Sequence, residues 1–469
     1  NCSVCLGAGL GSGKLERIEQ ANRSDSVVRF RWDHADLALY YNATRDLLQP
    51  LLTELIDLNQ PENDCDHVNP QLIDSIYERV VSVLNLCAIS YVPRHKKSFY
   101  KFWWSQELDC LKGQAIESNK LWLAAGRPRS GPVYTKRNSD KRAYRAAIRK
   151  AQSDANEQYS NHLHELLLNK RGSDFWKSWN AKFEHKIANQ MKVNGQVDTN
   201  LIVSIFADHF KVVNTDRKTK ACYKLQETYN SRRLNYIGSP FVDDNWCDVE
   251  LIEKVIGNMK RGKAAGLDDL TVEHLTHCHP VLLCILARLF NFFLYYGHVP
   301  PAFGQSYTVP LLKGSASSYN KNLTTNDFRG ISVSPVLSKV FEHCVLAKFE
   351  SFFTSSNNQF GFKKNVSCSH AIYTVRSVVS HYVSHGSTVS LAAVDISKAF
   401  DYMNHFGLFI KLMNRQVPLN LLLLLEDWFS KCFTCIKWLN LFSDMFQLTC
   451  GVRQGESCRH IYSLFISMM

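Results

Sequence analysis

The chain has 469 residues, of which 45% are hydrophobic, and it carries a formal net charge of +12 at pH 7. Such a length and apolar content are ample for a packed core and indicate two or three domains. The basic balance favours an anionic partner, and nucleic acid more readily than a membrane. The most apolar stretch, residues 281–296, contains Arg288 and Asn291 and is too short to span a bilayer, so we expect no membrane protein.

Fifteen cysteines are scattered through the chain without the pattern of a small disulfide-stabilised scaffold. A chain of this length does not need disulfides to fold, so we expect reduced thiols in an intracellular protein. Cys2/Cys5 and Cys432/Cys435 have the spacing of zinc ligands, but neither pair has a second pair at the required distance. We therefore expect no zinc site.

Residues 1–92 are predicted to form a helical N-terminal segment. Between residues 29 and 85, apolar side chains recur at helical spacing in two groups, which the polar loop 59–64 separates. The groups are Leu47, Leu48, Leu51, Leu52 and Leu55, and then Ile73, Ile76, Val80, Val83 and Leu84.

Residues 93–190 are predicted to be a basic, aromatic and helical linker. Its main element is a long helix over 139–168, whose cations off the apolar face include Lys141, Arg142, Arg145 and Arg149. Such a run of charge is usually a solvated face. Here cations alternate with aromatic side chains that can stack on bases or brace the helix, so we favour binding to nucleic-acid phosphates, without sequence preference. We expect the tryptophans of this region to be packing anchors: Trp103, Trp104, Trp176 and Trp179.

Residues 191–248 are predicted to be a connector with one short helix over 201–210, and residues 249–469 have catalytic character. The most informative segment is L-A-A-V-D-I-S-K-A-F-D, residues 391–401. Its four leading apolar residues are too few for a helix and suit a buried strand, which would place Asp395 at the strand's end, where a carboxylate can hold Mg²⁺. Taken alone, the segment fits better a core strand followed by a helix that Asp395 caps.

Five further motifs accompany this segment. They are K-A-A-G-L-D-D-L-T-V-E-H-L (263–275), V-P-L-L-K-G (309–314), D-F-R-G-I-S-V-S-P-V-L-S-K-V-F-E (327–342), Q-F-G-F-K-K-N-V-S-C (359–368) and, after the aspartate segment, G-V-R-Q-G (451–455). Each motif alone is weak, but the six together, in this order, resemble the reverse transcriptases of non-LTR (LINE-type) retrotransposons. The aromatic and basic pattern of residues 93–190 is similar to the linker that these elements place between endonuclease and reverse transcriptase.

The resemblance implies an α/β (α+β) fold, in which a helical N-terminal region precedes a right-hand polymerase domain (249–469) with fingers and a palm. The palm is expected to hold a small antiparallel sheet backed by helices. The implied activity is that of an RNA-directed DNA polymerase, a nucleotidyltransferase that uses two Mg²⁺ ions. Its partners would be an RNA template, a DNA primer and deoxynucleoside triphosphates, in an element ribonucleoprotein of nucleus and cytoplasm. The oligomeric state does not follow from the sequence.

The resemblance also assigns roles around the aspartate segment. Asp395 matches the catalytic metal ligand of the family, and the backbone carbonyl of Ile396 matches a secondary ligand. Phe400 matches the aromatic residue beneath the deoxyribose, which would clash with a 2′-hydroxyl. Asp401 is a further family signature, for which we expect an orienting role.

Substrate-binding residues are implied in two other motifs. Lys313 and Arg329 match cations of the fingers hairpin that bind the triphosphate. Without the family context, a surface ion pair with Asp327 is an equal alternative for Arg329. Gln454 matches the glutamine that touches the incoming nucleotide, and Gly455 lets the backbone approach closely.

The sequence departs from the family pattern at three places. Gly330 stands where Pro is usual, the Leu-Ser-Pro that should follow 451–455 is absent, and no aromatic-x-Asp-Asp hairpin or thumb precedes Met469. One carboxylate cannot hold two Mg²⁺ ions, so we expect a truncated fragment that does not polymerise alone. The alternative is a non-catalytic nucleic-acid-binding remnant of such an element. A group II intron-type maturase fits the linker and the 328–342 segment less well.

Overall fold

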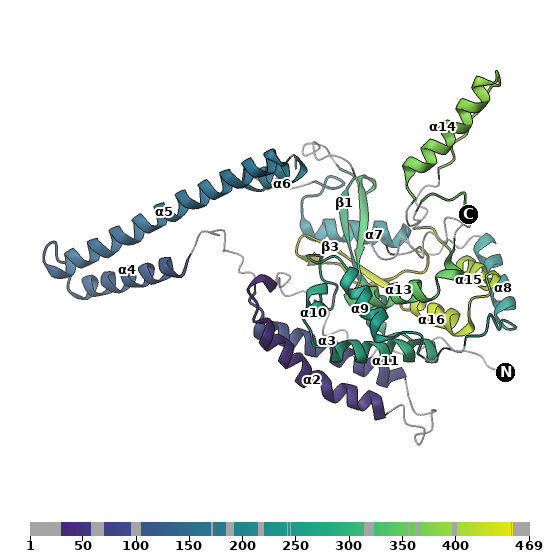
Figure 1. Cartoon of the computed structure of the whole chain (residues 1–469), viewed down its shortest axis with the longest axis horizontal. Coiled ribbons are helices and arrows are strands. Elements are labelled where there is room, and N and C mark those ends of the chain that lie inside the picture. The colour runs from purple at the N-terminus through teal and green to yellow at the C-terminus, as the bar shows by residue number, and fades with distance from the viewer. Residues whose placement is uncertain are drawn as a thin grey trace. The chain divides into compact units, whose positions relative to one another are not determined.

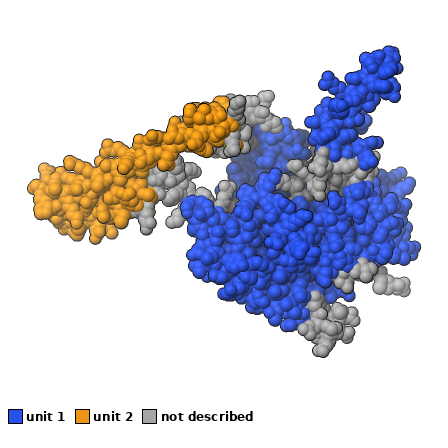
Figure 2. Space-filling model, in the orientation of Figure 1, with its two compact units in different colours: residues 1–94, 191–469 blue, residues 95–190 orange. Residues whose placement is uncertain are grey.

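The structure is a computed structural model, which describes residues 30–57, 70–94, 105–169, 172–183, 192–213, 220–241, 243, 245–313, 323–354, 357–361, 366–395, 401–451 and 453. The chain divides into two compact units, shown in different colours in Figure 2: unit 1, residues 1–94 and 191–469, and unit 2, residues 95–190. The N-terminal segment and the C-terminal region, which the sequence predicts as separate parts, share unit 1. The predicted boundary at residue 93 lies beside the observed one.

Two long amphipathic helices open unit 1, as predicted: α2 (Leu37–Asp57) and α3 (Pro70–Tyr91) (Figure 1). Each buries a stripe at helical spacing, because residues three and four apart share one helix face. In α2 the stripe is Tyr40, Thr44, Leu48, Leu51 and Leu55. Both helices pack against α11 (Val281–Tyr296), so they are part of the core of unit 1.

The central helix of unit 1 is α11, which buries ten of its sixteen residues. It is apolar on nearly all sides, as expected for a helix that other helices surround. Besides α2 and α3, it contacts α9 (Val249–Asn258) and α16 (Leu419–Ser430), and α9 in turn contacts α13 (Val336–Lys348). It ends at Gly297, whose φ of 59° lies in the left-handed region that glycine adopts without strain.

The sheet of unit 1 has five strands in the order β2-β1-β3-β4, with β5 also paired to β3. The strands are β1 (Gln305–Leu312), β2 (Phe328–Val333), β3 (Phe433–Trp438), β4 (Leu441–Phe442) and β5 (Phe446–Gln447). The mixture of helices and sheet agrees with the predicted fold class. The expectation of an antiparallel sheet is wrong for one pairing, because β1 and β3 run parallel, whereas β1–β2, β3–β4 and β3–β5 are antiparallel.

Smaller helices complete unit 1. The predicted short helix is α7 (Thr199–Val213), which contacts β3 and β4, and Phe206 packs on Phe328 and Trp438. A helix that was not predicted, α8 (Lys220–Arg233), packs on α15 (His405–Asn414). The remaining elements are η1 (Trp32–His34), α10 (Val272–Thr276), α12 (Pro301–Gly304), η3 (Thr325–Asp327), η4 (Glu350–Phe353) and α14 (Cys368–Ser384).

Unit 2 consists of three helices, α4 (Gln106–Ala124), α5 (Pro132–Leu168) and α6 (Gly172–Phe183). The predicted basic helix is α5, which begins seven residues earlier than expected, at Pro132, a residue that suits the first turn of a helix. Trp176 is 60% exposed, so the expectation of a packing anchor is wrong there, while Trp179 stacks on Phe175. Trp103 and Trp104 lie outside the described residues.

Among the described residues, no helix has both the length and the apolar character needed to cross a membrane. All cysteines in the described part of the chain are free thiols, including the predicted non-ligands Cys432 and Cys435, which are buried.

Candidate functional site

The loop before α10 packs tightly against the start of α13, which brings two of the sequence motifs together. A Cβ atom on Gly266 would lie 2.8 Å from Cα and 2.9 Å from N of Pro335, so only glycine allows this approach. The hydroxyl of Tyr307 in β1 donates to the carbonyl of Ala265 at 2.9 Å. The motif 263–275 therefore contacts the motif 327–342 and β1, the strand that leads into the motif 309–314.

Asp268, at this junction, has a buried carboxyl group. Its Oδ1 accepts a long hydrogen bond (3.4 Å) from the backbone N–H of Leu270, and its Oδ2 has no hydrogen-bond partner among the described residues. Burial raises the pKa of Asp268 to about 7, a shift that Asp269 reinforces and Lys339 opposes. Tyr77 of α3 faces the same region, and its hydroxyl also lacks a described partner.

The sequence did not single out Asp268 as a functional residue, although the aspartate belongs to the motif 263–275. Two adjacent aspartates in a loop usually indicate a solvated turn. Only the close packing of Gly266 on Pro335 shows that the first of them is enclosed. A buried titratable group with a strongly shifted pKa is a candidate for a functional site, and equally for a structural one.

His274 ends the same motif and is a buried structural residue. Its Nδ1 accepts from the backbone N–H of Thr271 at 3.0 Å and so caps α10. Its ring packs edge-on against Trp32, at 4.8 Å between centroids. Burial lowers the pKa of His274 to about 4, so the imidazole stays neutral at physiological pH.

The predicted phosphate-binding cations lie at the same end of the β1–β2 hairpin. Leu311 pairs with Arg329 across the hairpin, and Lys313 follows two residues after Leu311. Residues two apart in a strand share one face, so Lys313 and Arg329 lie on the same exposed face. The opposite face carries Phe328, which is buried. The structure therefore brings these two predicted cations to one end of the same hairpin.

The carboxylate of Asp327 caps the short helix η3. Its carboxylate accepts hydrogen bonds from the backbone N–H of Thr324 (2.8 Å) and from the Thr324 hydroxyl (2.9 Å), which cap η3. These bonds, with the nearby Lys313, hold the pKa of Asp327 below its usual value. The ammonium of Lys313 donates to the carbonyl of Asn326 at 2.7 Å, so this cation is held at the hairpin end.

Local packing explains why glycine, and not the proline of the family pattern, stands at position 330. A Cβ atom there would lie 2.9 Å from the ring of Phe210 in α7 and 2.8 Å from the side chain of Thr308. In this chain α7 lies so close to β2 that a larger residue would have to displace it.

The strand predicted before Asp395 is not formed. Residues 391–395 have no regular secondary structure, and the side chains are exposed, Leu391 by 70% and Val394 by 91%. An extended segment becomes a strand only when a neighbour satisfies its backbone groups, and no described strand pairs with this one. Asp395 is exposed, and Ile396 and Phe400 lie outside the described residues.

The described residues do not fit a two-metal site. No group of three or more histidine, cysteine, aspartate or glutamate side chains in the described part of the chain could hold a metal ion. A pair of Mg²⁺ ions needs several carboxylates close together. Asp395 on its own does not provide them.

The segment that follows Phe400 lies against the segment at the start of the motif 451–455. The backbone N–H of Gly451 donates to the carbonyl of Met403 (2.7 Å), and the Gly451 carbonyl lies 2.8 Å from Nε2 of His405. The thiol of Cys450 contacts the carbonyl of Asp401 at 3.6 Å. The residues directly after Phe400 thus lie against those directly before 452–455, although they are about fifty positions apart in the sequence.

The G-V-R-Q-G motif itself is described only in part. Arg453 is buried, and its guanidinium donates to the carbonyl of Phe303 at 3.1 Å, which gives this arginine a structural contact. Gln454 and Gly455 lie outside the described residues. The four predicted nucleic-acid-binding cations, Lys141, Arg142, Arg145 and Arg149, are all exposed on α5 in unit 2.

Comparison with known proteins identifies similarity in the C-terminal part of the chain. Residues 317–459 match the family described as reverse transcriptase (RNA-dependent DNA polymerase). The chain is also 25% identical, over 172 residues, to the retrovirus-related Pol polyprotein from type-2 retrotransposable element R2DM of Drosophila melanogaster. That alignment covers 37% of this chain and 16% of the relative, so the chain spans less than a fifth of that protein's length.

Proposed function

We propose that this chain serves RNA-directed DNA synthesis, because residues 317–459 match the reverse transcriptase family and the chain is similar over 172 residues to a retrotransposon Pol polyprotein. Its substrates would be an RNA template, a DNA primer and deoxynucleoside triphosphates. We further propose that it works in the element's ribonucleoprotein, in the nucleus and cytoplasm.

One observation carries this proposal beyond the family match. Hydrogen bonds hold residues 401–405 against residues 450–451, and these segments adjoin the two motifs to which the resemblance assigns nucleotide contacts. Phe400 would then lie beneath the sugar, and Gln454 and Gly455 would contact the incoming nucleotide. A contact between such distant segments is a property of the fold, and it does not depend on how closely each motif matches the family pattern.

The triphosphate would bind at the end of the β1–β2 hairpin. Lys313 and Arg329 lie on one face of that end, so both cations could reach the same chain of phosphates. The guanidinium offers a two-pronged contact, and the ammonium offers a point charge.

Reverse transcriptases use divalent metal ions, and we propose Asp395 as one ligand, with the carbonyl of Ile396 as a secondary ligand. The other carboxylates that follow Asp395 in the sequence are Asp401, Glu426, Asp427, Asp444 and Glu456. Glu426 binds Arg233, and Asp427 binds Lys431, so both are already neutralised. We therefore propose that these residues alone do not hold two Mg²⁺ ions and that the polypeptide does not polymerise unaided.

The test is triphosphate binding together with primer extension. Arg329→Ala and Lys313→Ala should each weaken dATP binding about tenfold or more, because each removes a charge-assisted contact. Lys224→Ala, which removes an exposed cation on α8 in unit 1, is the matched control and should leave the dissociation constant unchanged. Equal affinity in all three variants would refute the assignment of the hairpin.

Primer extension with Mg²⁺ tests the proposed need for further metal ligands. We expect no extension by the 469-residue polypeptide alone. Clear extension that Asp395→Asn abolishes would show that the residues of this polypeptide suffice.

A non-catalytic nucleic-acid-binding role is the second candidate. The absence of a metal-binding cluster among the described residues favours it, as does the exposed basic face of α5. If the chain binds nucleic acid but not dATP, the non-catalytic role is favoured over RNA-directed DNA synthesis.

A further inference from the structure

Charge is unevenly distributed along α5. Its first part, residues 132–150, is called here the basic half, because it contains seven lysines and arginines and one aspartate. Residues 151–168, the acidic half, contain three acidic residues and no lysine or arginine. The loop before α5 adds two exposed cations to the basic half, Arg127 and Arg129.

The two halves pack on different helices. The basic half lies along α4, where the guanidinium of Arg137 donates to Oδ1 of Asn119 at 2.8 Å and lies 3.9 Å from the ring centroid of Trp122. The acidic half lies along α6, where the hydroxyl of Tyr159 donates to the carbonyl of Ser178 at 2.6 Å. Figure 1 shows α4 beside the first part of α5 and α6 beside its end.

Three other cations of the basic half lie on a different helix face from Arg137. Arg142, Arg145 and Arg149 follow one another at i, i+3 and i+7, the spacing of a single helix face, and all three are exposed. Tyr144, Ile148 and Ala151 lie on a different face and are partly buried. We call Arg142, Arg145 and Arg149 the outer arginines. No hydrogen bond or ion pair joins them to the described residues, so their charge is available.

The aromatic side chains of α4 and α5 pack against these helices instead of facing outward. The indole N–H of Trp122 donates to the carbonyl of Pro128 at 2.9 Å, and Arg137 covers the ring. Tyr144 is partly buried on its own face of α5. Within the described part of unit 2, the exposed tryptophans are Trp176 and Trp179, which lie on α6 beside the acidic half. Among the described residues of unit 2, the outer arginines have no exposed aromatic neighbour on their face.

From this arrangement we infer that the outer arginines bind the phosphate backbone of a nucleic-acid duplex. Proteins that hold single strands combine cations with aromatic platforms on which bases stack, and the described residues of this face include no such platform. A duplex keeps its bases stacked inside and presents regularly spaced phosphates, which a rigid row of arginines can contact without reading sequence. The inference deepens the proposed function and rests on it for its biological setting, but it concerns unit 2 alone.

The test measures binding by the full chain in EDTA, without triphosphates, so that failure of the polymerase proposal does not affect it. The probes are a DNA duplex and an RNA–DNA hybrid of about 20 base pairs and the corresponding single strands, titrated over a range of salt concentrations. We expect tighter binding to the duplexes. Replacing all three outer arginines by alanine should weaken duplex binding roughly a hundredfold at 0.1 M salt and reduce the salt slope by about 3.

Alanine suits an exposed helix position, so the triple variant should retain its helix content. Lys224→Ala, Lys254→Ala and Lys260→Ala together remove three exposed cations from unit 1 and should leave duplex binding within a few-fold of the wild type. The triple arginine-to-lysine variant should also bind well, because phosphate contacts need charge more than shape. Tighter binding to single strands, an unchanged salt slope in the alanine variant, or loss of binding in the lysine variant would overturn the inference.

Discussion

At the scale of single residues, Gly266 and Gly330 show how little space separates the motifs of the C-terminal region. Gly266 lies against the backbone of Pro335, and Gly330 lies against the ring of Phe210. A side chain or a proline ring can shift, whereas backbone atoms move only with their whole element. We therefore expect Gly266 to tolerate substitution less well than Gly330.

Gly266→Ala should destabilise unit 1 by about 2 to 3 kcal/mol, because the added methyl group must push the start of α13 away. The matched control is Gly257→Ala in α9, where a Cβ atom meets nothing within 4 Å. That change should stabilise the protein by about 0.5 to 1 kcal/mol, since alanine favours a helix over glycine. Urea unfolding of both variants gives the comparison, and equal stability would show that the loop can relax at no cost.

The buried carboxyl of Asp268 predicts a pH dependence of stability. Its pKa rises on folding to about 7, so the folded state holds the proton more tightly than the unfolded state does. The stabilising contribution is therefore present at low pH and is lost as the pH rises from about 4 through 7. His274, with its lowered pKa, acts in the opposite direction below pH 6.5.

Asp268→Asn removes the first of these two effects and leaves the second. The difference in free energy of unfolding between variant and wild type should shift in favour of the variant by about 2 to 3 kcal/mol between pH 5 and pH 8. Urea unfolding at both pH values measures this shift. Parallel pH profiles for the two proteins would mean that the carboxyl group is solvated in the folded state.

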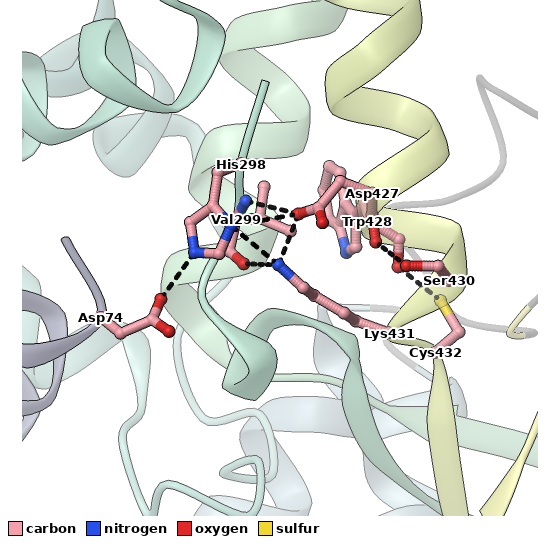
Figure 3. A network of polar contacts seen from close by, with 8 residues as sticks. All are labelled: Asp74, His298, Val299, Asp427, Trp428, Ser430, Lys431 and Cys432. Atoms are coloured by element: carbon pink, nitrogen blue, oxygen red, sulfur yellow. Dashed lines mark hydrogen bonds and ion pairs between the residues drawn. The ribbon is translucent and has the colours of Figure 1, made fainter. Parts of the chain in front are cut away.

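At the scale of elements, a polar network joins three parts of unit 1 (Figure 3). Nε2 of His298, just after α11, lies 2.9 Å from the carboxylate of Asp74 in α3. The ammonium of Lys431, after α16, donates to Nδ1 of His298 (3.0 Å), to the carbonyl of Val299 (2.8 Å) and to Asp427 (2.6 Å). Because Nδ1 accepts this bond, Nε2 carries the ring hydrogen and donates it in a hydrogen bond to the carboxylate of Asp74.

The Asp427–Lys431 pair should contribute more to stability than an exposed ion pair does. Both side chains are about a quarter exposed or less, and each makes further hydrogen bonds. A double-mutant cycle with Asp427→Ala and Lys431→Met should give a coupling energy of about 1 to 2 kcal/mol.

The matched cycle uses Glu54 and Arg79, which join α2 to α3 at 2.7 Å but are more exposed. Its coupling energy should be about 0.5 kcal/mol or less, because water and salt screen such pairs. Similar values for the two cycles would show that burial of the network adds nothing.

At the scale of the whole molecule, the N-terminal helices belong to the same compact unit as the region that matches the reverse transcriptase family. The stripes of α2 and α3 cover α11, and the side chain of Asn85 donates to the carbonyl of Asp268 at 2.9 Å. Removing these helices would expose apolar faces of α11 to water. Unit 2, in contrast, has its own helix pairings.

Two deletions should therefore behave differently. Deletion of residues 1–94 should yield insoluble or unfolded protein, since the core loses the layer that covers α11. Replacement of residues 95–190 by a flexible Gly/Ser linker should leave a folded protein with a cooperative thermal transition. If deletion of residues 1–94 gave a soluble protein that folds cooperatively, this result would contradict the observed division into units.

Several features could be predicted from the sequence because they depend on local periodicity. The helices α2, α3, α5 and α7 follow from the spacing of apolar residues, which reports which face a helix buries wherever its partner lies. The position of Lys313 and Arg329 on one hairpin was expected from the resemblance, which matches both to the family's fingers hairpin. The order of the motifs alone was enough to indicate the family.

Other features depend on contacts between residues far apart in the chain, and only the tertiary structure decided them. The parallel pairing of β1 with β3 joins segments more than a hundred residues apart, and the enclosure of Asp268 needs α3, α13 and the Gly266 loop at once. The strand expected before Asp395 had the right composition, but a strand exists only where a neighbour completes its hydrogen bonds. The composition of a segment shows which secondary structure it favours. Packing determines whether a neighbouring element is present to complete that structure.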